Sequence, residues 1–267
     1  MTKGNLREAA PIGIFDSGVG GLTVLQEIRR LMPLESIEYF GDTARTPYGG
    51  KDTETLASHG REIINFLLGK GAKIIVVACG TISSTAFEQL CQEFPHVPIV
   101  DTIRPAAKAT LELAEENPGM KPVFIATEAS VRSGLFAKLV CEKTALYTRA
   151  CPLFAPMIEA GLATQRNNPL LNFVAETYLA DLWGKVDTLI LGCKHYPLLA
   201  DALTHALGEI TFINPAAATA EAVKNILFTH ALQAEGTASK INYHTSGDPK
   251  KFSQIARFIL NEEIEAN

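Results

Sequence analysis

The sequence predicts an α/β fold made of two similar α/β domains with mostly parallel sheets. Short β-branched or aromatic runs alternate along the chain with longer amphipathic segments, which is typical of βαβ units. Residues 73–84 and 187–199 also share one plan: a buried apolar strand, a cysteine at its carboxyl end, polar residues and then a helix. A chain of 267 residues is long enough for two such domains, since a domain averages roughly 150 residues.

Nine short runs have the composition of strands. In chain order they are residues 12–15, 37–40, 74–78, 98–100, 123–126, 146–148, 188–191, 210–213 and 242–244. The segments between them carry the spacing of apolar side chains that predicts helices. Asp248 followed by Pro249 predicts the N-cap and the first residue of the last helix.

The two matching segments, residues 73–84 and 187–199, each belong to one of the expected domains. Residues 1–98 together with 213–267 form the first α/β domain, which carries Cys79. Residues 99–212 form the second α/β domain, which carries Cys193. The final strand and helix thus return to the first domain.

Composition and charge exclude several classes of protein. With 24 basic and 29 acidic residues the formal net charge is −5, so no basic surface indicates nucleic acid or an anionic membrane as partner. The longest strongly apolar stretch, residues 74–79, is far too short to cross a bilayer, and the first ten residues lack the apolar core of a signal peptide. We therefore expect a cytoplasmic protein with no membrane partner.

The five cysteines do not form a disulfide framework or a zinc site. Their number is odd, and the chain contains no Cys-x-x-Cys pair. We expect Cys91, Cys141 and Cys151 to be small buried apolar residues. Cys79 and Cys193 differ from these three because each stands at the end of a strand, near the start of a helix, where a thiolate is favoured.

Polar residues cluster repeatedly at the carboxyl ends of the predicted strands, where α/β sheets bind ligands. The clusters are residues 16–18, 41–43, 79–81, Thr127 and 193–195. Residues 16–21 lack the Gly-Lys-Ser/Thr of a Walker loop, and Thr23 stands where a dinucleotide fingerprint needs its third glycine. A carboxylate ligand therefore fits better than a nucleotide. Two cysteines in matching positions favour an acid and a base on opposite faces of one carbon, as inversion of a stereocentre requires. A hydrolase with a Cys–His nucleophile is the alternative.

Several of these stretches, in this order, resemble the cofactor-independent glutamate racemases of the aspartate/glutamate racemase family. The resemblance runs from about residue 12 to residue 260. It is carried by GIFDSGVGGLTV (13–24), GDTARTPYG (41–49), ACGT (78–81), CPLF (151–154) with Glu159, LGCKHYP (191–197) and TSGD (245–248).

The resemblance implies an active site in the cleft between the two domains and reversible interconversion of L- and D-glutamate, which supplies D-glutamate for peptidoglycan and the cell wall. It implies no cofactor, no metal and a homodimer. Cys79 and Cys193 are the implied acid/base pair, assisted by Asp16 and His195 respectively, with Asp42 and Glu159 in support. The implied substrate-binding residues are Asp16, Ser17, Tyr48, Gly49, Gly80, Thr81, Thr127, Ser130, Lys194 and His195.

Among the positions that depart from the family pattern, two contact the substrate in the family. Members usually carry Asn after the first cysteine and Thr after the second, where this chain has Gly80 and Lys194. Our hypothesis is that the Lys194 ammonium fills the space vacated at Gly80 and binds a substrate carboxylate; the alternative is that Lys194 points into solvent. The departures also leave open a racemase of another substrate, such as aspartate or a hydantoin, or a non-catalytic glutamate-binding relative.

Overall fold

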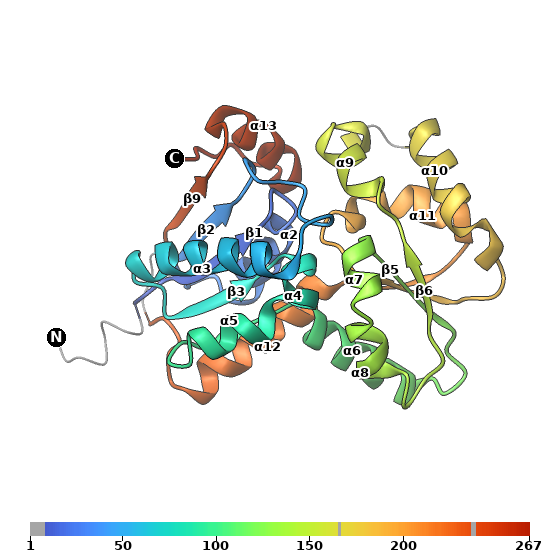
Figure 1. Ribbon diagram of the computed structural model, residues 1–267, viewed down its shortest axis with the longest axis horizontal. Coiled ribbons are helices and arrows are strands. Elements are labelled where there is room, and N and C mark those ends of the chain that lie inside the picture. Colours follow the sequence, from blue (N-terminus) through green and yellow to red (C-terminus); the bar gives the residue numbers. More distant parts are fainter. Residues whose placement is uncertain (1–8, 165–166, 236–238) are drawn as a thin grey trace.

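The computed structural model describes residues 9–164, 167–235 and 239–267, and its strands form two fully parallel sheets, one in each half of the molecule (Figure 1). The first sheet has the strand order β4-β3-β1-β2-β9, and the second has the order β6-β5-β7-β8. The strands are β1 (Ile12–Asp16), β2 (Ile37–Gly41), β3 (Ile74–Val77), β4 (Ile99–Val100), β5 (Pro122–Ala126), β6 (Tyr147–Ala150), β7 (Thr188–Leu191), β8 (Thr211–Ile213) and β9 (Ile241–Thr245). Every strand that the sequence predicts is present, and the predicted α/β class is confirmed.

Helices connect the strands and cover both faces of each sheet. The α-helices are α2 (Leu22–Leu31), α3 (Thr53–Gly69), α4 (Gly80–Thr85), α5 (Phe87–Glu93), α6 (Ile103–Glu116), α7 (Glu128–Arg132), α8 (Leu135–Val140), α9 (Phe154–Glu159), α10 (Pro169–Leu179), α11 (Ala200–Leu207), α12 (Pro215–Thr229) and α13 (Pro249–Leu260). Three short 3₁₀ turns are η1 (Leu162–Thr164), η2 (Ala180–Leu182) and η3 (Tyr196–Leu199). The predicted N-cap of α13 is confirmed, because Asp248 accepts hydrogen bonds from the backbone N–H groups of Lys250 and Lys251.

The first sheet is buried on both faces because its strands are apolar on both sides. In β1, Ile12 and Ile14 face the core under α2, α12 and α13, whereas Phe15 faces the core under α3, α4 and α5. Residues of β3 alternate in the same way. Because helices pack on both faces of the sheet, the positions of the residues that follow the carboxyl ends of β1 and β3 are fixed.

The second sheet repeats the arrangement. Leu189 and Leu191 of β7 pack against α9, α10 and α11, and Ile190 faces the core under α6 and α8. On that second face the rings of Phe124 and Phe136 stack with their centroids 4.2 Å apart. The two sheets therefore place β3 and β7 at equivalent positions between two layers of helices.

The chain crosses between the sheets after β4 and again after β8. The strand β4 lies just past the expected division at residue 98, yet it pairs with β3, so the first sheet extends to Val100. The strand β8 pairs with β7, so the second sheet extends to Ile213. As a division into domains, the expected boundaries stay a prediction.

Burial of the cysteines outside the strand ends differs from expectation. Cys151 is fully buried, but Cys91 is only partly buried and Cys141 is exposed. The prediction for Cys141 was wrong because this residue caps the surface-facing end of the short helix α8. Among the described residues no helix has the length and apolarity needed to span a membrane, and no three His, Cys, Asp or Glu side chains gather as metal ligands would.

Candidate active site

The site forms where three parallel strands end. β1 ends at Asp16, and β3 and β7 end two residues before Cys79 and Cys193. Because β1 and β3 are neighbours in the first sheet, Asp16 and Cys79 leave it side by side. Cys193 leaves the second sheet in the position that corresponds to Cys79.

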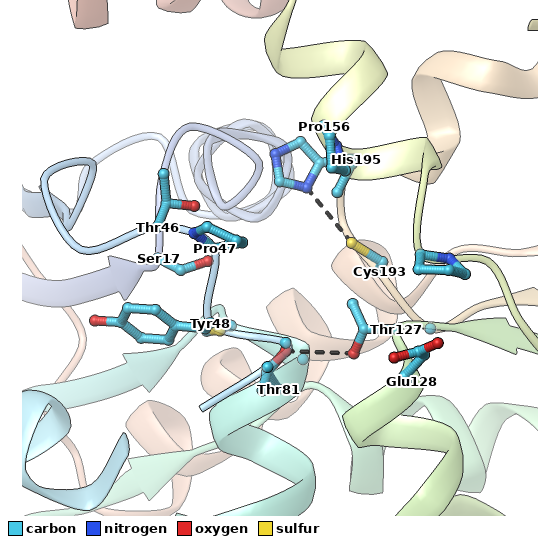
Figure 2. Close-up of a pocket in the computed structure, with 17 residues that line it drawn as sticks. Ser17, Thr46, Pro47, Tyr48, Thr81, Thr127, Glu128, Pro156, Cys193 and His195 are labelled. Carbon is cyan, nitrogen blue, oxygen red and sulfur yellow. Dashed lines mark hydrogen bonds between the residues drawn. The ribbon is translucent and has the colours of Figure 1, made fainter. Parts of the chain in front are cut away.

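Both cysteines line one cavity of about 210 Å³ between the two halves of the molecule. Figure 2 shows Ser17, Tyr48 and Thr81 on one side of it and Thr127, Cys193 and His195 on the other. The full lining is Ser17, Thr46, Pro47, Tyr48, Gly49, Gly50, Cys79, Gly80, Thr81, Thr127, Glu128, Pro152, Ala155, Pro156, Gly192, Cys193 and His195. The cavity is smaller than the roughly 300–1,000 Å³ of pockets for drug-sized ligands, so it suits a very small molecule.

The Cys79 side of the cavity is almost fully shielded from solvent. The Cys79 side chain is 3% exposed, and this burial raises the pKa of its thiol from 9.0 to about 11. The Asp16 carboxylate raises that pKa as well, whereas the Lys194 charge and a hydrogen bond from Ser17 lower it. Asp16 itself stands behind the lining, and its Oδ2 accepts a hydrogen bond from the backbone N–H of Gly21 at 2.9 Å. A thiolate formed at Cys79 is therefore a strong base.

The Cys193 side is built around an imidazole. The Sγ atom of Cys193 lies 3.4 Å from Nδ1 of His195, within hydrogen-bond reach for sulfur (Figure 2). His195 is 4% exposed and packs against the turn that precedes α2, where a Cβ at Gly20 would lie 2.8 Å from its ring. The glycine in the first domain thus leaves room for the histidine of the second.

Hydroxyl groups form the floor of the cavity. Thr81 Oγ1 and Thr127 Oγ1 are 3.4 Å apart and connect the two domains (Figure 2). Ser130 does not line the cavity; its Oγ accepts a hydrogen bond from Thr127 Oγ1 at 3.1 Å and donates one to the Gly80 carbonyl at 3.3 Å. Ser130 therefore orients the groups that do face the cavity.

Asp42 also lies behind the lining, where it is fully buried. Its Oδ2 accepts hydrogen bonds from the Tyr48 hydroxyl and from Nε of Arg45, the latter at 2.7 Å. Its Oδ1 accepts one from Ser246 Oγ at 2.6 Å. This carboxylate ties the wall formed by residues 46–50 to the end of β2 and to the segment after β9. Glu159 ends α9, and its side chain lies outside the described structure.

Lys194 is 5% exposed, so the alternative that it points into solvent was wrong. It is absent from the lining, and its Nζ lies 3.7 Å from the position that a Cβ at Gly80 would take. The ammonium thus occupies the space beside Gly80, as our hypothesis expected. Whether it meets a substrate carboxylate stays a prediction.

Eight lining residues were not named from the sequence. They are Thr46, Pro47, Gly50, Glu128, Pro152, Ala155, Pro156 and Gly192. Thr46, Pro47, Pro152 and Gly192 fall inside the motif stretches, so the motifs located those walls without naming the residues. Glu128, the exposed first residue of α7, carried no signal at all.

The fold and the cavity define an enzyme of the α/β class with two thiols facing one small ligand space. The family model for Asp/Glu/hydantoin racemases matches residues 23–223. The chain is 40% identical over 258 residues to a glutamate racemase of Thermus thermophilus, covering 96% of this chain and 95% of that protein. A crystal structure of a glutamate racemase isoform from Bacillus anthracis superposes with a TM-score of 0.90 at 34% identity, covering 97% of each chain. The glutamate racemase of Francisella tularensis, solved in complex with D-glutamate, does so with a TM-score of 0.87 at 30% identity, covering 97% of this chain and 96% of that chain.

The chain therefore belongs to the Asp/Glu/hydantoin racemase family, as its motifs predict, and is an isomerase.

Proposed function

We propose that this protein interconverts L- and D-glutamate, with Cys79 and Cys193 as the acid/base pair. The observation that carries the proposal is that two cysteines from corresponding strand ends of two domains line one cavity. A small ligand between them presents opposite faces to the two sulfurs. The names of the relatives support glutamate as the substrate.

The reaction needs only two proton transfers. One thiolate removes the α-hydrogen as a proton, so the C–H bond breaks, an S–H bond forms and the electron pair stays on the α-carbon. The thiol on the other side then donates its proton to the opposite face, which closes a new C–H bond and inverts the centre. The negative charge ends on the second sulfur, and the same steps run backwards convert the other enantiomer.

Neighbouring groups control each sulfur. Asp16 and the burial of Cys79 make its thiolate a strong base, which suits a weak carbon acid. The ring of His195 lies close enough to Cys193 to exchange a proton with it. Hydroxyls of Ser17, Thr81 and Thr127 face the cavity and can donate to substrate carboxylates, so fixed dipoles stabilise the charge that develops on the α-carbon.

Polarimetry on the purified protein, with no cofactor added, tests the activity. Solutions of L- and of D-glutamate should both decay to zero rotation, and the two aspartate enantiomers should react far more slowly. Faster reaction of aspartate would show that aspartate, not glutamate, is the substrate. Absence of reaction with either amino acid would overturn the proposal. In deuterium oxide the product should carry deuterium at the α-carbon; inversion with the original hydrogen retained would exclude exchangeable thiols.

We further propose that the D-glutamate serves peptidoglycan synthesis. Expression of the chain in a bacterium that requires D-glutamate should restore growth without the supplement, and the Cys193→Ser variant should not. Failure of the unaltered chain to restore growth would contradict this role, and growth restored by the variant would contradict the part assigned to Cys193. The expected homodimer and the cytoplasmic location stay predictions, and sedimentation velocity at assay concentration would test the first of them.

A further inference from the structure

The side chain of Lys194 crosses from one domain to the other. Its backbone follows β7 of the second sheet, while its Nζ lies beside Gly80, the first residue of α4 in the first domain. A Cβ at position 80 would lie 3.7 Å from this Nζ and only 2.7 Å from the Gly192 carbonyl oxygen. The lysine thus fills a space that exists because position 80 has no side chain.

The ammonium is buried without a direct partner. Lys194 is 5% exposed, and among the described residues its Nζ has no hydrogen-bond partner. Burial of an unpaired ammonium is costly, so it persists only where surrounding negative charge offsets the loss of hydration. Such a charge beside the reacting groups indicates a role in their chemistry.

Four titratable groups face this ammonium. Asp16 comes from β1, Asp101 follows β4, and the two cysteine sulfurs follow β3 and β7. The Asp101 carboxylate is already paired with Arg104 at 2.5 Å, and Asp16 accepts the N–H of Gly21. Burial lowers the pKa of Lys194, while all four groups act to raise it.

The cavity itself offers no strong cation. None of the described residues that line it is a lysine or an arginine, and one of them, Glu128, is an acid. A substrate with two carboxylates and one ammonium brings a net negative charge to a site that also holds a thiolate. The Lys194 ammonium stands behind the lining, next to Gly80.

We propose that Lys194 is a positioning residue: its ammonium, held in the space left by Gly80, is the fixed positive charge that allows a thiolate and an anionic substrate to share the cavity. The inference rests on the proposed function. In its charged form the lysine acts on both sulfurs and on the substrate through its field and transfers no proton itself. Gly80 and Lys194 are accordingly a matched pair, since a Cβ at position 80 would already touch the ammonium at 3.7 Å and a longer side chain would compete with it for space.

The test removes the positive charge of Lys194 and keeps the length of its side chain. In Lys194→Met, kcat/KM should fall about 10–100-fold and by the same factor for both enantiomers, because L- and D-glutamate have equal free energy. The pH at which Cys79 becomes alkylated by iodoacetamide, followed by peptide mass mapping, should rise by about one unit or more, since loss of a nearby cation disfavours the thiolate. Lys185→Met, at an exposed lysine on the same domain, is the matched control and should change neither value.

The alkylation profile needs no turnover, which separates this inference from the proposed function. An inactive wild-type protein whose Lys194→Met variant still shows the shift would overturn the function and leave the charge effect standing. An unchanged alkylation profile, or an unchanged kcat/KM in an active enzyme, would overturn the inference. A variant with lower thermal stability but the wild-type profile would reduce Lys194 to a packing role.

A double-mutant cycle tests the matched pair. Gly80→Asn alone should cost more than the combination of Gly80→Asn with Lys194→Thr, because the second change vacates the space beside position 80 that the amide group needs. The contact of the added Cβ with the Gly192 carbonyl, at 2.7 Å, is common to both variants and cancels in the comparison. Strictly additive losses in kcat/KM would show that the two positions are independent. Circular dichroism identifies variants that fail to fold, and Lys194→Met, which retains side-chain length, then carries the test alone.

Discussion

The two cysteine-bearing strand ends have the same plan but different surroundings. Cys79 is almost fully buried beside a carboxylate, whereas Cys193 is partly exposed with an imidazole 3.4 Å from its sulfur. Under the proposed mechanism both sulfurs perform the same task, the gain and loss of a proton, in these two surroundings. Burial and a carboxylate surround the first sulfur, and an imidazole lies beside the second.

The strongest test of this comparison removes each sulfur in turn. Cys79→Ser and Cys193→Ser should each lower racemisation by about 10³-fold or more, since a hydroxyl is a far weaker acid than a thiol and proton transfer is lost. In deuterium oxide each variant should still exchange the α-hydrogen of one enantiomer, and the two variants should differ in which one. Nuclear magnetic resonance of the α-hydrogen measures both effects.

Cys141→Ser is the control for these variants, because Cys141 is exposed and is not part of the cavity lining. It should keep wild-type activity. Exchange of both enantiomers by either active-site variant would mean that one sulfur reaches both faces of the substrate.

The second test uses pH to compare the two sulfurs without substrate. Because the pKa of Cys79 is raised to about 11, its thiolate forms only as pH rises toward that value, and its alkylation should keep accelerating up to that pH. At neutral pH its thiolate fraction should be about 100-fold below that of a thiol with a pKa of 9.0. Iodoacetamide labelling with mass mapping of each cysteine gives the profile; a plateau for Cys79 near pH 9 would contradict the buried, carboxylate-flanked setting.

The third test replaces, one at a time, the side chain that neighbours each sulfur. Asp16→Asn and His195→Gln should each lower kcat by about 10–100-fold, within the range of a single acid/base assistant. Asp16→Asn removes a charge that raises the pKa of Cys79, so it should shift the Cys79 alkylation profile to lower pH, whereas His195→Gln removes the imidazole beside Cys193 and should leave that profile unchanged. Steady-state kinetics measures kcat, and iodoacetamide labelling measures the profiles. Identical Cys79 alkylation profiles for the two variants would contradict the different roles assigned to Asp16 and His195.

The smallest expected effect concerns a residue that supports the wall of the cavity. Asp42→Asn weakens the hydrogen bonds to Tyr48 and Arg45 that hold residues 46–50, so KM should rise several-fold while kcat changes little. Asp201→Asn, on the exposed start of α11, is the control and should leave KM unchanged. A loss confined to kcat would place Asp42 in the proton transfers themselves.

Local signals were sufficient to predict the strands. Buried β-branched runs such as those of β3 and β7 stand out between turns, and β7 lies at its predicted residues. The edge strand β6 is displaced toward Ala150, because its residues are half-exposed and lack a run of apolar side chains. The crossing after β4 could not be located, because pairing of a two-residue strand depends on packing rather than composition.

The sequence predicted where the site lies, but not which side chains line the cavity. Parallel strands bring their carboxyl ends together, so the clusters at Asp16, Cys79 and Cys193 could be placed at one edge. Which side chains reach the cavity depends on how two domains meet, and sequence spacing does not contain that information. Asp16, Ser130 and Lys194 accordingly stand behind the lining, while Glu128 enters it.

The contact between Gly20 and His195 makes the position of one imidazole depend on both domains. The ring beside Cys193 packs against backbone contributed by the opposite domain, where a Cβ at Gly20 would lie 2.8 Å from it. A side chain added in the first domain would therefore disturb the group nearest to the sulfur of the second, so the turn before α2 and the segment after β7 tolerate change only together.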